Sequence, residues 1–193
     1  MATFLKKGKS ENDIQQADNK IKEIVSGILK DVKENGDVAV RKLSQQFDKW
    51  SPASFRLSPA QIQEAMASLP EQTVNDLKFA QQQIRFFAEK QRASITDIEV
   101  ETMPGVFLGH KNIPVNSVGC YVPGGRYPLV ASAHMTILTA KVAGVKRVIA
   151  CTPPDNGKIP AATVCAMHLA GADEIYILGG VQAIAAMGLG TET

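Results

Sequence analysis

The chain has little net charge and no long apolar run, and these two absences exclude several classes of protein. Its 193 residues include 21 Lys and Arg against 19 Asp and Glu, a formal charge of +2. This excess is too small to predict a surface for nucleic acid or anionic lipid. No stretch approaches the ~18 apolar residues of a membrane span, and the opening MATFLKKGKSENDI has no secretory signal. We therefore expect a cytoplasmic protein without nucleic-acid or membrane partners.

Cysteine is scarce as well. Cys120, Cys151 and Cys165 are odd in number, form no C-x-x-C pair and lie in apolar segments. None has a nearby His or helix start that would lower the pKa of its thiol, which argues against a nucleophilic cysteine. Buried free thiols in a reducing compartment explain the pattern best. The remaining composition, 45% hydrophobic and 21% charged, is that of a globular protein with a buried core.

Residues 1–93 are predicted to form a helical region. Apolar residues recur at three- and four-residue spacing over 14–32, which is the period of an amphipathic helix. Gly36 in ENGD suits a left-handed cap that ends this helix. A later helix is predicted to begin at Ser58, because Gln61 completes a capping box with it. A further helix follows Pro70.

Residues 94–193 are predicted to be a hairpin followed by an incomplete Rossmann-like domain. Alternating polarity around Pro104-Gly105 predicts the hairpin. Three strands without a polar face follow, at 117–122, 145–152 and 174–180, and helices alternate with them. Such strands form a parallel sheet with helices on both faces, so the fold class is α/β. Because these sheets normally have about five or six strands, we expect the chain to be the N-terminal part of a longer protein.

Two Gly-Gly pairs stand where strands of this sheet end, in VGCYVPGGRYPL (118–129) and LGGVQA (178–183). Their glycines are Gly124, Gly125, Gly179 and Gly180. Ligands of open parallel sheets lie beyond the carboxyl ends of the strands, and glycine lets a ligand approach the free N–H groups of a helix start. The pairs can therefore line one crevice for a dinucleotide, with Tyr121 and Gln182 as hydrogen-bonding side chains. The alternative is two sharp turns, since the G-x-G-x-x-G spacing is absent.

The histidines give no complete catalytic set. His168 has mostly apolar helix neighbours and is predicted to pack, whereas His110 follows a hairpin strand and is predicted to lie on the surface. His134 lies one to two turns into the helix after the first Gly-Gly pair, near Ser132 and Arg126. No Cys/His spacing typical of zinc occurs, and the α/β half has no carboxylate pair at helical spacing.

Four segments together closely resemble the histidinol dehydrogenase family: NGDVAVRKLSQQFD, VGCYVPGGRYPL, AKVAGVKRVIACTPP and HLAGADEIYILGGVQAIAAMGLGTET. The resemblance extends from about residue 10 to the last residue, and family members are about twice this length. It implies a homodimeric, zinc-dependent enzyme that oxidises a primary alcohol through an aldehyde to a carboxylate with two NAD⁺. It also implies an aldehyde-dehydrogenase-like pair of incomplete Rossmann domains.

The resemblance also implies roles for particular residues. NAD contacts in the family include the tyrosine of YxPGG and the glutamine of GGxQA, which match Tyr121 and Gln182. The zinc ligands and the Glu-His acid/base pair are expected beyond residue 193, so no metal ligand or catalytic residue is predicted within this chain. The chain alone is then expected to be inactive. The alternative function is a non-catalytic, truncated nucleotide-binding or dimerisation module.

One departure from the family bears on the substrate. VASAHM replaces the Ser-Ser pair usual in histidinol enzymes, and Arg126 stands where a small neutral residue is common. The helix looks more like a branch that oxidises 2,3-dihydroxypropane-1-sulfonate (sulfopropanediol). Arg126 and a protonated His134 would attract a sulfonate and repel the cationic groups of L-histidinol. We predict the sulfonate, with Arg126, Ser132 and His134 as substrate contacts, and L-histidinol as the alternative.

Overall fold

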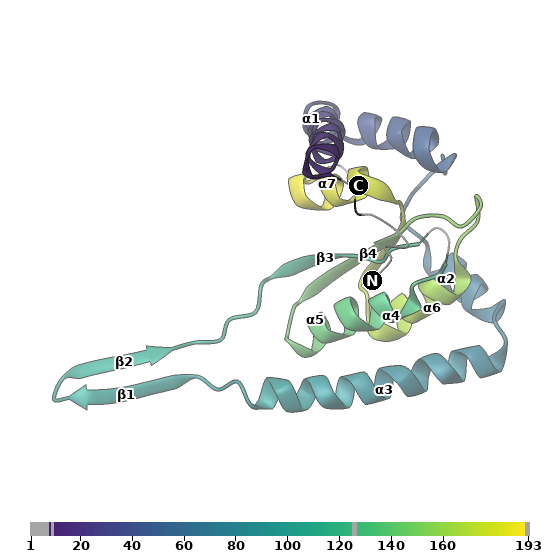
Figure 1. Cartoon of the computed structure of the whole chain (residues 1–193). Coiled ribbons are helices and arrows are strands. Elements are labelled where there is room, and N and C mark those ends of the chain that lie inside the picture. The colour runs from purple at the N-terminus through teal and green to yellow at the C-terminus, as the bar shows by residue number, and fades with distance from the viewer. Residues whose placement is uncertain (1–7, 9, 125–126, 192–193) are drawn as a thin grey trace, which may run out of the picture.

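The computed structural model describes residues 8, 10–124 and 127–191, and it confirms the α/β class. A parallel three-stranded sheet in the order β3-β4-β5 forms the centre. Helices α1 and α7 cover one face, while α2, α3, α6 and the helix after β3 cover the other (Figure 1). No helix in the described part of the chain has the length and apolarity to cross a membrane.

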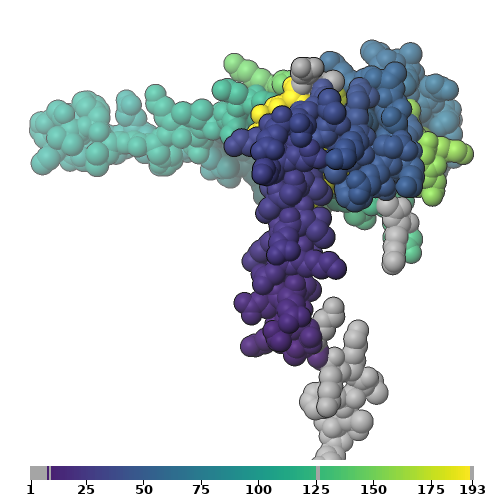
Figure 2. Space-filling view, turned by 90° about the horizontal axis from the view of Figure 1, so that it is seen from above, coloured from purple at the N-terminus to yellow at the C-terminus, as the bar shows by residue number. Residues whose placement is uncertain are grey.

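The first helical segment ends at Gly36, as predicted, and a second segment follows it directly. Helix α1 (Glu11–Asp48) therefore contains a kink, at which Gly36 has the non-helical angles φ 54° and ψ −134°. Only the part of its apolar stripe from Ile28 onward is buried, whereas Ile14 and Ile21 are exposed. The N-terminal half of α1 projects from the body (Figure 2).

The next two helices cover the sheet from the opposite side. Helix α2 (Pro59–Ala67) begins with the predicted capping box, in which Ser58 accepts from the Gln61 amide and Gln61 accepts from that of Ser58. Helix α3 (Glu71–Ala93) follows and packs along α5 and α6. Both helices share a core with the sheet. The predicted domain boundary after residue 93 stays a prediction.

The sheet consists of β3 (Ser117–Tyr121), β4 (Arg147–Thr152) and β5 (Glu174–Ile177). One continuous helix joins the first two strands and includes α4 (Val130–Ala133), a π-helical segment η1 (His134–Leu138) and α5 (Thr139–Val142). Helix α6 (Ala161–Ala170) joins β4 to β5, and α7 (Gly180–Leu189) follows β5. The core between sheet and helices is fully buried at Ile137, Val148, Val164 and Ile177.

A segment of extended chain closes the outer edge of β5. The Leu57 amide donates to the Ile175 carbonyl (2.9 Å), and the Ile177 amide donates to the Phe55 carbonyl (2.8 Å). The indole of Trp50 donates to the Ile177 carbonyl at 3.0 Å. This edge therefore has backbone partners, whereas the outer edge of β3 pairs with no strand among the described residues.

The predicted hairpin is present and extends away from the body as an arm (Figures 1 and 2). Strand β1 (Ile98–Met103) pairs antiparallel with β2 (Val106–His110), and every residue of both strands is exposed. Gly105 in the turn has a φ of 77°, a conformation that glycine adopts without strain.

Candidate functional site

The carboxyl ends of the three parallel strands meet at one edge of the sheet. The register aligns Tyr121 with Cys151, and Thr152 with Ile177. Both predicted glycine turns contact Pro153, which follows β4. A Cβ added at Gly124 would lie 2.9 Å from its Cγ, and one at Gly179 would lie 2.6 Å from its Cβ. The two turns are thus neighbours, and close packing alone requires glycine at these two positions.

Tyr121 joins the end of β3 to the start of α7. Its hydroxyl oxygen accepts a hydrogen bond from the Gly180 backbone N–H at 3.2 Å. Burial raises the pKa of this phenol, so the hydroxyl keeps its proton and can donate it to a ligand. The structure therefore places Tyr121 and Gly180, two of the predicted cofactor residues, in direct contact.

Gln182 is the most informative side chain at this edge. It is 1% exposed, and neither Oε1 nor Nε2 has a hydrogen-bond partner in the part of the chain that the structure describes. An unpaired buried amide costs about 1–3 kcal/mol, and such groups are rare in folded proteins. Its oxygen lies 2.7 Å from where a Cβ of Gly180 would stand, so the amide packs against the start of α7. A polar ligand is the simplest partner for it.

Asp48, the last residue of α1, completes this cluster, although it was not among the predicted site residues. Its Oδ2 is buried without a partner among the described residues and lies 3.2 Å from where a Cβ of Gly179 would stand. Burial raises the pKa of its carboxyl group. Asp48 ends one of the segments that resemble the family, but its contact with α7 depends on how α1 packs on α7, which no local pattern reveals.

The predicted substrate contacts lie apart from this cluster or outside the described residues. Gly125 and Arg126 belong to the residues that the structure does not describe. Ser132 is half-buried in α4. No hydrogen bond among the described residues joins Ser132 or His134 to Tyr121 or Gln182, so the role of these residues stays a prediction.

His134 is buried between α3 and α6, in surroundings that favour the neutral ring. Gln81 Nε2 donates to the Ala166 carbonyl at 2.8 Å and lies 3.0 Å from Nδ1 of His134. The bond to the carbonyl fixes the orientation of the amide, so Nδ1 must accept and the proton of the neutral ring is on Nε2. Burial also lowers the pKa of His134. The expected cationic imidazolium therefore does not fit this environment.

The other two histidines both lie on the surface. His110 is exposed, as predicted, but His168 is also exposed, so its predicted packing is wrong. Within residues 8, 10–124 and 127–191, no three His, Cys, Asp or Glu side chains are grouped so that they could hold a metal ion. The zinc ligands stay a prediction for other residues.

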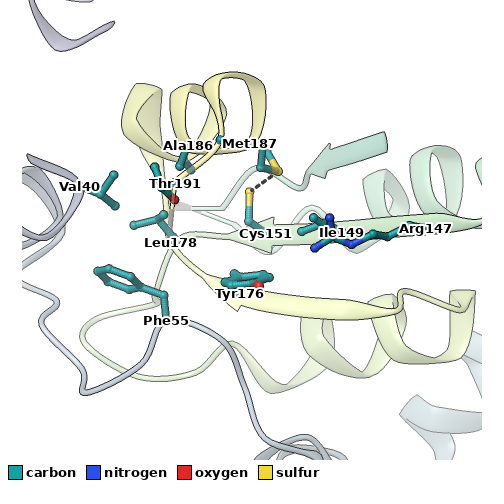
Figure 3. A pocket seen from close by; sticks show the side chains of 12 residues that line it. Val40, Phe55, Arg147, Ile149, Cys151, Tyr176, Leu178, Ala186, Met187 and Thr191 are labelled. Carbon is teal, nitrogen blue, oxygen red and sulfur yellow. Dashed lines mark hydrogen bonds between the residues drawn. The ribbon is translucent and has the colours of Figure 1, made fainter. Parts of the chain in front are cut away.

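A separate cavity lies between α7 and the sheet, and it does not suit a coenzyme (Figure 3). Its volume is about 190 Å³, and its lining includes Cys151, Tyr176, Leu178 and Met187. Ligand pockets usually measure about 300–1,000 Å³. Burial raises the pKa of Cys151 to about 12, and its thiol faces the Met187 sulfur at 3.8 Å. This cavity is a packing feature of the α7 face.

Fold and site together define an open α/β protein in which Tyr121, Gln182 and Asp48 gather at the carboxyl edge of a parallel sheet, the edge where such proteins bind their ligands. Comparison with known proteins gives the family. The model of the histidinol dehydrogenase family matches residues 11–193, and the chain belongs to this family of dehydrogenases.

Individual relatives carry two different enzyme names. The chain is 65% identical to a histidinol dehydrogenase homolog of Shouchella clausii, covering 100% of this chain and 46% of that protein. It is 45% identical to the sulfopropanediol 3-dehydrogenase of Ruegeria pomeroyi (97% and 42% covered) and 40% identical to the histidinol dehydrogenase of Methanosarcina barkeri (100% and 43%). The crystal structure of histidinol dehydrogenase from Elizabethkingia anophelis superposes with a TM-score of 0.82 at 31% identity, covering 98% of this chain and 41% of that one. The chain thus spans less than half the length of these relatives.

Proposed function

We propose that this chain supplies the NAD-binding part of a zinc-dependent dehydrogenase that oxidises a primary alcohol through an aldehyde to a carboxylate. The observation that carries the proposal is the unpaired, buried amide of Gln182 beside the Tyr121–Gly180 contact, at the edge of the sheet where α/β proteins bind their ligands. Family membership and the order of the motifs support the same reaction class.

The residues of this chain hold and orient the coenzyme in this proposal. Tyr121 fixes the start of α7 and offers its O–H, while the Gln182 amide provides one donor group and one acceptor. Gly124 and Gly179 allow the backbone to approach the ligand closely. When bound, zinc would polarise the alcohol and NAD⁺ would accept the hydride. We place the zinc ligands and the acid/base pair in polypeptide beyond residue 193.

Two buried glutamines allow a matched test of coenzyme binding. Gln81 has protein partners, whereas Gln182 has none in the described structure. Calorimetric titration of NAD⁺ should show that Gln182→Met weakens binding about tenfold or more without lowering the free energy of unfolding, whereas Gln81→Met keeps binding and loses about 1–3 kcal/mol of stability. Unchanged NAD⁺ affinity in Gln182→Met would place the coenzyme elsewhere.

For the substrate we propose 2,3-dihydroxypropane-1-sulfonate, with L-histidinol as the alternative. Because His134 is predicted to be neutral, the argument for an anionic substrate now depends on Arg126. In a polypeptide of the relatives' length, Arg126→Ala should lower kcat/KM for the sulfonate by about 10- to 100-fold, the range of a hydrogen bond to a charged group. The exposed Lys146→Ala serves as the control. A wild-type preference for L-histidinol would contradict the proposal.

We also propose a cytoplasmic homodimer. The hairpin arm carries exposed Val100, Phe107 and Leu108, and an apolar surface of this kind is typical of an interface. The alternative function is a non-catalytic nucleotide-binding or dimerisation module. An NADH absorbance assay with added zinc separates the two, because the 193-residue chain should be inactive and a longer polypeptide should turn over. Light scattering at several concentrations would test the dimer.

A further inference from the structure

We propose that Asp48 accepts hydrogen bonds from a ribose of the coenzyme, and that the start of α7 therefore holds this ribose rather than the diphosphate. The inference rests on the proposed NAD-binding function and deepens it. It makes Asp48 a residue that selects NAD⁺ over NADP⁺.

Three elements bring the polar groups of this subsite together. Asp48 ends α1, Tyr121 ends β3, and Gln182 lies in the first turn of α7. Helix α1 packs along α7 (Figure 1), which carries the Asp48 carboxylate to the Gly179 backbone. Asp48 Oδ2 and both polar atoms of Gln182 are buried and unpaired within the described residues. One polar ligand would provide hydrogen-bond partners for the unpaired atoms of both neighbouring side chains.

The charge at this place argues against the diphosphate. A helix N-terminus attracts anions through its free N–H groups and its dipole. Here the Gly180 N–H already donates to Tyr121, and the Asp48 carboxylate lies against the adjacent residue. Among the residues whose positions are described, no Lys, Arg or His forms a salt bridge with Asp48, and the Lys49 ammonium contacts the Gln46 carbonyl. A diphosphate would therefore meet an uncompensated negative charge.

Ribose has the chemistry that these groups lack. Its vicinal hydroxyls donate to a carboxylate, the arrangement by which acidic residues recognise the ribose of NAD. The Gln182 amide can donate to a hydroxyl oxygen and accept from its proton. A phosphate on the 2′ position would remove one donor and bring a second negative charge toward Asp48. The same carboxylate that binds NAD⁺ would thus exclude NADP⁺.

A purely structural role for Asp48 would leave a different signature. A carboxylate that serves to hold a helix start accepts from its N–H groups, but the Gly180 N–H bonds to Tyr121 instead. A carboxylate with one oxygen buried and unpaired, as in Asp48, weakens the folded state of the free protein. Removing its charge should therefore stabilise the free chain and weaken the complex, two effects of opposite sign.

The test measures NAD⁺ and NADP⁺ affinity by calorimetry for the wild-type chain, Asp48→Asn and the control Glu34→Gln. Glu34 lies on the same helix, is exposed, and is replaced with the same change of charge. Wild type should bind NAD⁺ at least about tenfold more tightly than NADP⁺, and Asp48→Asn should lose about tenfold in NAD⁺ affinity and most of that preference. Its melting temperature should equal or exceed that of wild type, and Glu34→Gln should change none of these quantities.

The outcomes separate this inference from the function on which it rests. If Gln182→Met loses NAD⁺ binding but Asp48→Asn keeps both affinity and preference, the NAD site stands and the role of Asp48 is refuted. A lower melting temperature in Asp48→Asn would make the carboxylate structural and also overturn the inference. If wild type binds no NAD⁺, both proposals fail.

Discussion

The chain contains two β structures that both carry apolar residues but have opposite surroundings. In the hairpin arm, Val100 is 50% exposed and Phe107 is 63% exposed. In the central sheet, Val148 and Ile177 are completely buried. Both β structures contain β-branched and large apolar residues, although the hairpin alternates them with polar residues and the sheet strands have no polar face. Residue type alone therefore does not explain the difference in exposure. The difference comes from the helices that cover the sheet on both faces and leave the arm uncovered (Figure 1).

This contrast indicates that the sheet stabilises the fold, whereas the arm is available for contacts with other polypeptide. Strands that pack between helix layers contribute apolar burial, which is the main stabilising term of folding. A two-stranded hairpin is marginal by itself in water, and its exposed apolar residues suit contact with further polypeptide. We therefore expect substitutions to destabilise the chain when they fall in the sheet and to affect assembly when they fall in the arm.

The largest expected effect compares one side chain from each structure. Ile177→Ala removes buried methyl and methylene groups and should lower the free energy of unfolding by about 2–5 kcal/mol. Val100→Ala in the hairpin should change that of the monomeric chain by no more than about 0.5 kcal/mol, as for other surface positions. Denaturant titration of the two variants measures both values. Similar losses in the two variants would mean that the arm is covered in solution.

Two glycines extend the comparison to the backbone. Gly179 has no room for a side chain, because a Cβ would lie 2.6 Å from that of Pro153. Gly179→Ala should therefore cost about 1–3 kcal/mol, as in overpacked cores, and should weaken NAD⁺ binding. Gly105 in the hairpin turn has open space but a φ of 77°, so Gly105→Ala should cost about 1–2 kcal/mol through backbone strain alone. Its NAD⁺ affinity, measured by the same calorimetry, should equal that of wild type.

Much of the fold could be predicted from local pattern. The capping box at Ser58 and Gln61, the hairpin turn at Gly105 and the parallel strands follow from residue types at short spacing. Features that depend on distant contacts were not predicted. The 55–57 segment pairs with β5 across more than a hundred residues of chain, and the exposed first half of α1 has the same periodicity as a buried stripe.

In the candidate site, too, some features follow from local sequence and others depend on distant contacts. The strand ends predicted that the two glycine turns would meet, and Tyr121 indeed contacts Gly180. Asp48 was missed because its relation to α7 arises from the packing of two helices. The expectation of a cationic His134 was misleading because its partner Gln81 is distant in sequence, and their contact makes the ring an acceptor. Local sequence thus locates the edge of the sheet but not the electrostatics there.

A smaller effect should appear in the pH dependence of stability, and it concerns the core. Burial holds the pKa of His134 below its ordinary value of 6.5. The unfolded chain therefore binds more protons as pH falls through 6.5, so the stability provided by neutral His134 is complete above this pH and is lost below it. His134→Asn keeps an acceptor for Gln81 and does not titrate. Between pH 7 and 5.5 the wild type should lose about 1 kcal/mol relative to this variant. Equal pH dependence in wild type and His134→Asn would contradict the assignment of a neutral, buried ring.

The last comparison concerns thiol reactivity and should leave stability almost unchanged. Burial raises the pKa of Cys120, Cys151 and Cys165, that of Cys151 to about 12. At pH 8 roughly one Cys151 in ten thousand is then a thiolate, the reactive form. In the monomeric chain, a cysteine introduced into the hairpin by Val100→Cys has no such protection and should react with Ellman's reagent within seconds to minutes. The three native thiols should react only as fast as the chain unfolds, and denaturant should release all of them together. If a native thiol reacts as quickly as the hairpin cysteine, the sheet opens locally without global unfolding, and the contrast between the two β structures is one of degree.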